Sequence, residues 1–437
     1  MPPEPAATAP PPRTLDARRA TRGGALLLLA LVSACALPPP PAEPVCPAPA
    51  REATAKLALP IAPVLPSPAP APATPLGEAI DALLRDGVLP RTTAGIRVLS
   101  LATGATLYEH DAERLLAPAS NLKLLTAAGA LGILGADHEL ETTLSVADDG
   151  RTLFLRGCGD SLLRSDELAA LAGEAASRLD AKRSYVLKAD LSCFDDLYWG
   201  KGWMWDDEPD PDAMYLSPLS VNGNTVVVKV EPADEVGDKP KVSLIPRTRA
   251  VHIDNRAKTV AEKKKEPLEV ERRPGDRDNL VRISGPIERG ADPVERRISV
   301  WAPQAIALEI VQRGLEARNV KLEPKGYGRS PARVTTLARR ARKVGELVRH
   351  MLKTSHNLTA ECLLKYLAHH ETGRAGSAED GISAIRSWLA GRGVPVDELV
   401  WVDGSGLSRY NLVTAAALAR LLSLARTEPG LAPLEDA

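Results

Sequence analysis

The segment from Leu115 to Gly135, LLAPASNLKLLTAAGALGILG, constrains the fold most, because its pattern predicts a buried helix with two polar residues at its start. The apolar residues recur at helical spacing, and Gly135 marks the expected end of the helix. Ser120 and Lys123 are three residues apart and would face the same side. A serine needs a neighbouring base to become a nucleophile. S-x-x-K alone is a weak motif, so two polar residues near a helix end are the alternative interpretation.

A second polar motif, SHN, runs from Ser355 to Asn357 and begins the helical pattern NLTAECLLKYLAHH. A serine and an amide on one loop can relay a proton and hold a substrate carbonyl, and we expect His356 between them to point away. Ser355 could instead be a helix N-cap. A triad of Ser120 and His356 is a further alternative, but the seven histidines are scattered and give it little support.

The N-terminal segment predicts export from the cytoplasm. The stretch GGALLLLALVSAC follows several arginines and is too short to cross a bilayer as a finished helix. VSAC, Val32 to Cys35, resembles a bacterial lipobox in which Cys35 is lipidated, whereas ACA also fits simple secretion. We therefore expect a lipoprotein-type signal peptide over 1–35 and a Pro/Ala-rich tether over 36–75. The predicted location is the periplasmic cell envelope, with a secreted soluble protein as the alternative.

Helical and strand-like segments alternate along the rest of the chain and predict an α/β (α+β) fold. Residues 76–137 combine helical patterns with a hairpin signal around ATGA at 102–105. Short strand-like runs fill 138–335, including a mixed-charge run over 256–277 that we expect to be solvated, and helical patterns return over 336–437. The middle range, 138–335, therefore reads as one or two β-rich domains between segments of helical character.

Charge and cysteine usage narrow the classes of function. The 55 Lys and Arg residues nearly balance the 56 Asp and Glu residues, so no basic field is available for nucleic acid. Cys46 lies in the tether, Cys158 and Cys193 could pair in an oxidising compartment, and Cys362 is expected to be a buried apolar residue. Neither C-x-x-C nor H-E-x-x-H occurs in the sequence, so no metal site is predicted.

Taken together, the motifs resemble those of the penicillin-interacting serine enzymes, which carry S-x-x-K, S-x-N and K-T-G. The resemblance is closest to the D-alanyl-D-alanine carboxypeptidase/endopeptidase family, the low-molecular-mass class C penicillin-binding proteins, and runs from about Gly77 to the C-terminus. It rests on PASNLKLLTAAGAL, LRGCGDSLL, DLSCFDDLYWGKGWMWDD, SPLSVNGNTV, SHNLTAECLL and DGSGLSRYNLVT. It implies a β-lactamase-like transpeptidase domain, with β-rich domains inserted in the roughly 235 residues between Ser120 and Ser355.

The resemblance also implies roles for individual residues. Ser120 would be acylated, Lys123 would be the general base, and Ser355 and Asn357 would relay the proton and anchor the substrate amide.

Two further residues would line the pocket for an amino-bearing substrate side chain. These are Asp207, at the end of the W-x-W-x-D pattern, and Arg409, in GLSRYN. Of the neighbouring segments, the tryptophans are expected to serve in packing, and DGSG, Asp403 to Gly406, is a turn or part of the site. The tryptophans are Trp199, Trp203 and Trp205.

The implied activity is cleavage of D-Ala-D-Ala bonds in peptidoglycan stem peptides through an acyl-enzyme, with β-lactams as inhibitors and no cofactor. K-T-G does not occur after Asn357, and the last lysine is Lys365. We therefore expect a chain truncated before that motif, with impaired activity. The alternatives are a non-catalytic peptidoglycan- or penicillin-binding remnant and a serine β-lactamase. The sequence leaves open the oligomeric state and the balance between carboxypeptidase and endopeptidase activity.

Overall fold

The computed structural model describes residues 74–87, 89–262, 264–275 and 278–437. The expected signal peptide, all but the last residues of the expected tether, Cys35 and Cys46 lie outside the described residues. Within the part that is described, no helix is both long enough and apolar enough to cross a membrane.

The α-helices lie towards the two ends of the described chain and at two places within 138–335. They are α1 (Pro75–Leu84), α2 (Lys123–Gly129), α3 (Ser165–Ala176), α4 (Pro303–Glu316), α5 (Val344–Thr354), α6 (Asn357–Thr372), α7 (Ala378–Ala390), α8 (Ala415–Ala425) and α9 (Pro433–Asp436). Short helical turns are η1 (Leu89–Arg91), η2 (Ala119–Leu122), η3 (Ala130–Leu134), η4 (Trp205–Asp207), η5 (Asn222–Asn224) and η6 (Pro429–Leu431).

A five-stranded sheet is built from strands between residues 139 and 343, in the order β14 (Lys321–Tyr327), β5 (Ser184–Asp190), β4 (Thr152–Gly157), β3 (Glu139–Ala147) and β15 (Val334–Lys343). Helices α3 and α4 pack against each other and against this sheet. The sequence pattern predicts strands in this part of the chain, and neither helix was predicted. The buried residues Leu168, Leu171, Ala172 and Ala175 of α3 nevertheless have the spacing of an amphipathic helix.

Three smaller sheets hold the remaining strands of this region. Their orders are β13-β6-β7, β10-β11-β8 and β12-β9. The strands are β6 (Thr225–Glu231), β7 (Lys241–Ile245), β8 (His252–Asn255), β9 (Lys258–Val260), β10 (Glu269–Arg272), β11 (Leu280–Ser284), β12 (Pro286–Glu288) and β13 (Val294–Ser299). The expected solvated run over 256–277 is therefore wrong in part, because it contains β9 and β10. Arg272 is fully buried, and its Nη1 lies 2.8 Å from Glu208 Oε1.

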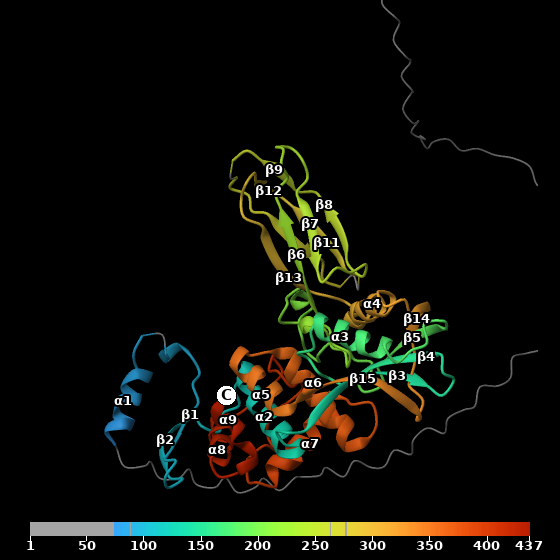
Figure 1. Cartoon of the computed structure of the whole chain (residues 1–437). Coiled ribbons are helices and arrows are strands. Elements are labelled where there is room, and N and C mark those ends of the chain that lie inside the picture. The colour runs from blue at the N-terminus through green and yellow to red at the C-terminus, as the bar shows by residue number, and fades with distance from the viewer. Residues whose placement is uncertain (1–73, 88, 263, 276–277) are drawn as a thin grey trace, which may run out of the picture. The chain divides into compact units, whose positions relative to one another are not determined.

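The C-terminal helices gather around α2 (Figure 1) and share one apolar core with it. Helices α5 to α8 all contact α2. Its small residues explain this close packing, because a Cβ atom on Gly129 would lie 2.4 Å from the Ile385 side chain of α7. The predicted hairpin is confirmed as β1 (Ile96–Leu99) paired with β2 (Thr106–His110), and α8 packs on β1. Helix α2 and the helices that follow residue 343 therefore build a common core.

Candidate active site

Ser120 and Lys123 lie at the start of the central helix, in the turn formed by η2 and the first residue of α2. Lys123 Nζ lies 3.0 Å from Ser120 Oγ. The serine is exposed, whereas only 1% of Lys123 is accessible to solvent. A first-turn position leaves the Ser120 N–H without an intrahelical acceptor, so it is available for a ligand oxygen. The two residues are therefore a hydrogen-bonded pair with the serine facing solvent.

The SHN motif, whose serine lies 235 residues after Ser120 in the sequence, contacts this pair. Ser355 Oγ donates to Ser120 Oγ at 2.7 Å, and Asn357 Oδ1 accepts from Lys123 Nζ at 2.6 Å. Ser355 ends α5 in the left-handed conformation, with φ of 58°, which is uncommon for a serine. The N-cap interpretation is wrong, because the hydroxyl binds Ser120 and His356 occupies the N-cap position of α6.

Lys123 has a third partner on a further segment, the carbonyl oxygen of Ser405 at 2.8 Å. Burial lowers the pKa of Lys123 to about 8, against the opposing charges of Glu361, Asp403 and Asp212. A neutral amine has two N–H donors and one lone pair. Since the oxygens of Asn357 and Ser405 can only accept, the donors point to them and the lone pair is left for the Ser120 hydroxyl. The arrangement therefore favours proton transfer from Ser120 to Lys123.

Glu361 holds the backbone of the DGSG turn beside the site. The sequence motifs did not predict this residue. It is buried and accepts hydrogen bonds from the backbone N–H groups of Gly404, at 3.0 Å, and Ser405, at 2.8 Å. Burial and the neighbouring charge of Asp403 raise its pKa. Glu361 lies four residues after Asn357, one turn along the same face of α6. This spacing could have predicted from the sequence that Glu361 lies near the site. The DGSG segment is thus both a turn and a wall of the site.

His356 takes no part in the hydrogen bonding of Ser120. Its Nδ1 lies 2.7 Å from Thr359 Oγ1, and its ring packs edge-on against His350 at 5.1 Å. Burial, followed by nearby positive charges, lowers the pKa of His356 to about 4. The alternative of a Ser120–His356 triad is therefore wrong, and the expectation that this ring points away from Ser120 agrees with its contacts.

Asp207 and Arg409 lie on two loops that are joined next to the site. Trp203 Nε1, on the first loop, donates to Asp403 Oδ2 on the second at 3.0 Å. Asp207 Oδ2 accepts from the Met204 N–H at 3.1 Å, and Arg409 is exposed. In the described part of the chain, neither side chain forms a hydrogen bond with the Ser120 network. Their contact with a substrate therefore stays a prediction.

The three tryptophans of the first of these loops differ in burial. Trp199 and Trp203 pack together with their ring centroids 5.1 Å apart. The expected packing role is wrong for Trp205, which is 72% exposed. The same loop region contacts the site through its backbone, because Asn357 Nδ2 donates to the Asp212 carbonyl at 2.8 Å.

The structure shows the state of three of the cysteines. Cys158 and Cys193 form a disulfide, and Cys362 is free and buried. Among the described residues, one group could hold a metal ion, namely Cys158, Cys193 and His369. Two of its three ligand atoms are joined in the disulfide, so this group does not fit a metal ion in the oxidised protein.

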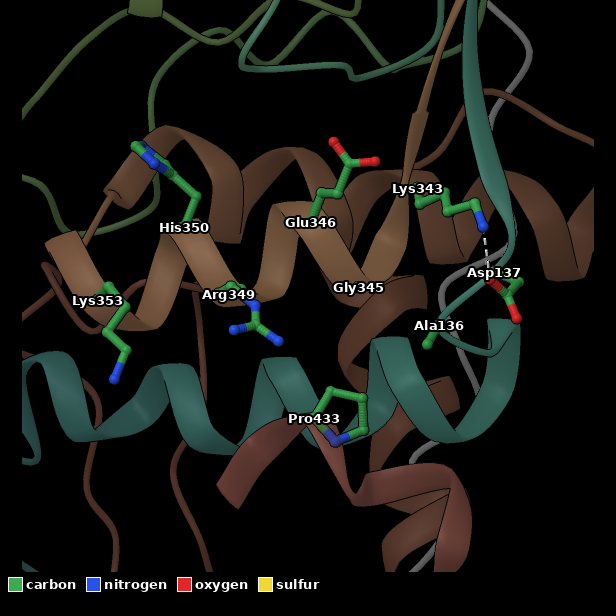
Figure 2. A pocket seen from close by; sticks show the side chains of 9 residues that line it. All are labelled: Ala136, Asp137, Lys343, Gly345, Glu346, Arg349, His350, Lys353 and Pro433. Carbon is green, nitrogen blue, oxygen red and sulfur yellow. Dashed lines mark hydrogen bonds and ion pairs between the residues drawn. The ribbon is translucent and has the colours of Figure 1, made fainter. Parts of the chain in front are cut away.

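A groove of about 570 Å³ lies beside α5, next to Ala136 and Asp137, with Pro433 at its edge (Figure 2). Arg349, His350 and Lys353 of α5 contribute its basic lining. None of Ser120, Lys123, Ser355 or Asn357 lines this groove. It is therefore distinct from the Ser–Lys site.

The fold and the Ser–Lys site define a serine hydrolase of the penicillin-binding class. The profile of the D-Ala-D-Ala carboxypeptidase 3 (S13) family matches residues 76–436, and the chain belongs to this family.

Named relatives agree with this assignment. The chain is 35% identical over 406 residues to a D-alanyl-D-alanine carboxypeptidase of an Actinomadura species, covering 87% of this chain and 74% of the relative. It is 25% identical over 339 residues to D-alanyl-D-alanine carboxypeptidase DacB of Haemophilus influenzae, covering 75% and 70%. The crystal structure of penicillin binding protein 4 from Haemophilus influenzae matches with a TM-score of 0.68 at 23% identity, covering 78% of this chain and 77% of that one. This structural likeness confirms the predicted fold class.

Proposed function

We propose that Ser120 is the nucleophile of a serine-type D-Ala-D-Ala carboxypeptidase that acts on peptidoglycan stem peptides. The observation that carries this proposal is the hydrogen-bonded set of Ser120, Lys123, Ser355 and Asn357, in which a buried lysine of lowered pKa faces an exposed serine. Membership of the family supports the reaction and the substrate class.

The contacts of these residues support the following order of steps. Neutral Lys123 takes the Ser120 proton while Oγ attacks the carbonyl carbon of the penultimate D-alanine, and the Ser120 N–H stabilises the oxyanion. The hydroxyl of Ser355, 2.7 Å from Ser120 Oγ, gives its proton to the departing amine and takes in return the proton held by Lys123, so that D-alanine leaves and the lysine is neutral again. Asn357 holds the substrate amide. Water then attacks the acyl-enzyme by the same route in reverse, which frees the shortened peptide and restores Ser120.

β-Lactams would acylate the same serine, since their strained amide stands in for the D-Ala-D-Ala bond. The structure of penicillin binding protein 4 from Haemophilus influenzae has also been solved with a β-lactam. A β-lactamase would instead release the hydrolysed drug rapidly. A non-catalytic remnant would bind penicillin without forming a covalent bond to Ser120.

The test compares Ser120→Ala, Lys123→Ala and the control Lys353→Ala, which changes an exposed lysine two residues before Ser355. We expect covalent labelling by a fluorescent penicillin to disappear in the first variant and to slow by about 100- to 10,000-fold in the second. The control should label as the unmodified chain does. Labelling that survives Ser120→Ala would rule out this nucleophile, and rapid release of the drug would favour the β-lactamase.

We further propose that the carboxylate of Asp207 and the exposed Arg409 flank the substrate's amino-bearing side chain. Asp207→Asn should then raise KM for a stem peptide with a free side-chain amine and leave KM unchanged for its acetylated form.

We propose a division of the chain into domains at the boundaries that the sequence motifs indicate. Residues 76–137 and 336–437 form one transpeptidase-like domain, and 138–335 form the inserted region. The apolar core shared by α2 with α5 to α8 supports the pairing of the two outer segments. We also propose that Cys35 carries a lipid and that residues 36–75 tether the enzyme in the periplasm, in keeping with the cell-wall substrate of the family.

A further inference from the structure

A row of hydrogen bonds reaches the SHN motif from the segment between β4 and α3. Ser161 Oγ, in that segment, lies 2.7 Å from Thr359 Oγ1 of α6. Thr359 Oγ1 in turn lies 2.7 Å from Nδ1 of His356, the N-cap residue of the same helix. Ser161 and Thr359 are fully buried. This row of Ser161, Thr359 and His356 is called the hydroxyl link, and it joins segments that are 198 residues apart in the sequence.

The hydroxyl of Thr359 is the central group of the link, because it bonds to both neighbours. A hydroxyl has one proton to donate and two lone pairs, so Thr359 can donate to one partner and accept from the other. Without this hydroxyl, the buried Oγ of Ser161 and the Nδ1 of His356 would both lose their partner in the link. A buried polar atom without a partner is costly. We therefore expect the backbone around His356 to shift when the hydroxyl is removed.

The ring of His356 is enclosed on its other sides. It packs edge-on against His350 of α5, with the ring centroids 5.1 Å apart. A Cβ atom on Gly223, in η5, would lie 3.5 Å from His356 Nε2. The hydroxyl link fixes the Nδ1 side of the ring, so the orientation of the whole side chain is defined by its contacts.

The position of His356 bears directly on Ser355, the residue before it. Ser355 has φ of 58°, a left-handed conformation that a residue other than glycine keeps only where its surroundings hold it. Ser355 is itself exposed, and its Oγ bonds to Ser120 Oγ at 2.7 Å. Asn357, on the other side of His356, has two further hydrogen bonds that hold it. Of the two polar residues of the motif, Ser355 thus depends more on the hydroxyl link.

We propose that Thr359 and Ser161 are positioning residues for Ser355, and that the hydroxyl link holds the SHN turn in its reactive geometry. The inference rests on the proposed function for the reaction that Ser355 assists. Both hydroxyls are buried and do not touch a substrate, so they act through Ser355. Because Ser355 serves in proton transfer, the link sets the rate of acylation and not the affinity for the ligand.

The kinetic test uses Thr359→Val, which removes the hydroxyl and keeps the branched shape. At saturating fluorescent penicillin we expect acylation to slow by about 10- to 100-fold, because a small displacement of a reacting group has a cost of this order. The drug concentration that gives the half-maximal rate should stay the same. Ser161→Ala leaves the bond between Thr359 and His356 in place and should slow acylation by only about three- to tenfold. Thr359→Ser keeps the hydroxyl and should restore the unmodified rate.

Two controls separate positioning from a general loss of stability. Thr372→Val makes the same change on the same helix, where the hydroxyl bonds to the Ala368 carbonyl, and it should label at the unmodified rate. The second control combines Thr359→Val with Ser355→Ala. Since the residue to be positioned is then gone, the double variant should label at the rate of Ser355→Ala alone. Additional slowing as large as that in the unmodified chain would overturn the inference, and so would unchanged labelling of both Thr359→Val and Ser161→Ala.

Crystal structures of the variants separate this inference from the proposed function. In Thr359→Val we expect Ser355 to leave the left-handed region and its Oγ to move beyond hydrogen-bonding distance of Ser120 Oγ. Thr359→Ser should keep both features, and Ser161→Ala gives the same comparison if Thr359→Val does not fold. If penicillin does not label the unmodified chain, the proposed function fails, and the structures still decide the inference. A Ser355 that keeps its conformation without the link would refute it, even if labelling is normal.

Discussion

At the residue scale, the chemistry depends on what surrounds one amine. Lys123 is buried among three oxygens that belong to a side-chain hydroxyl, an amide and a backbone carbonyl. An ammonium group is costly to bury, so its pKa falls. Glu361 and Asp403 limit this fall, because a nearby negative charge favours the ammonium form. The opposing effects leave the pKa of Lys123 about one unit above neutral pH, where a base can both take up and return a proton.

The acylation rate should follow the neutral fraction of Lys123. With a pKa of about 8, Lys123 is mostly an ammonium group below pH 8. The rate constant for penicillin labelling should therefore rise about tenfold per pH unit below pH 8 and become constant above that pH. The measurement is the second-order labelling rate from pH 5 to 10, corrected for hydrolysis of the drug in buffer. A profile that is flat from pH 6 to 9 would exclude Lys123 as the base.

At the scale of the element, the turn of DGSG holds the start of the nucleophile helix in place. Gly406 has φ of +82°, and a Cβ atom there would lie 1.9 Å from the carbonyl oxygen of Ala119. Ala119 is itself in the left-handed region, with φ of 46°. Two uncommon backbone conformations therefore meet directly before Ser120.

Gly406→Ala should displace Ala119 and with it Ser120. We expect penicillin labelling to fall by at least about 100-fold, comparable to the loss of one oxyanion-hole donor, together with a lower melting temperature. Gly430→Ala is the control, because nothing lies within 4 Å of a Cβ atom at that position. Unchanged labelling of Gly406→Ala would show that this turn does not position the serine.

The disulfide joins the segments that follow β4 and β5. Cys158 and Cys193 are 35 residues apart, and closing such a loop stabilises the folded state by roughly 4 kcal/mol in the chain-entropy treatment. The double variant Cys158→Ser/Cys193→Ser should therefore unfold at a clearly lower urea concentration. Adding a dithiol reductant should lower the midpoint of the unmodified chain and leave that of the double variant unchanged. A further drop in the double variant would mean that the reductant acts elsewhere.

The sequence predicted those parts of the molecule that depend on local pattern. Ser120, Lys123, Ser355 and Asn357 could be proposed because two short motifs carry them. Glu361 and the carbonyl of Ser405 could not, since a backbone oxygen has no signature and its role depends on packing between distant segments. The hairpin of β1 and β2 was predicted from its turn. The parallel pairing of β14 with β5 joins Lys321 to Ser184 and has no local signal.

At the scale of the whole molecule, the proposed tether makes a prediction about location. If Cys35 is lipidated, the protein expressed in its host should sediment with membranes, and Cys35→Ala should release it into the soluble envelope fraction. Cys46→Ala is the matched control and should stay with the membranes. A freely soluble protein with Cys35 intact would favour cleavage at ACA. Penicillin labelling should be the same in all three proteins, because neither cysteine belongs to the proposed Ser120 site.

The distance in sequence between the two halves of the site has a consequence for synthesis. Ser120 meets Ser355 only across a separation of 235 residues, and Lys123 contacts Ser405 across 282. A nascent chain therefore exposes an ordinary serine until nearly all of it has emerged and folded. If Ser120 is the nucleophile, as we propose, an enzyme that could damage the wall of its own cell gains its reactivity only on folding, and covalent labelling of Ser120 by penicillin reports that these distant segments have come together.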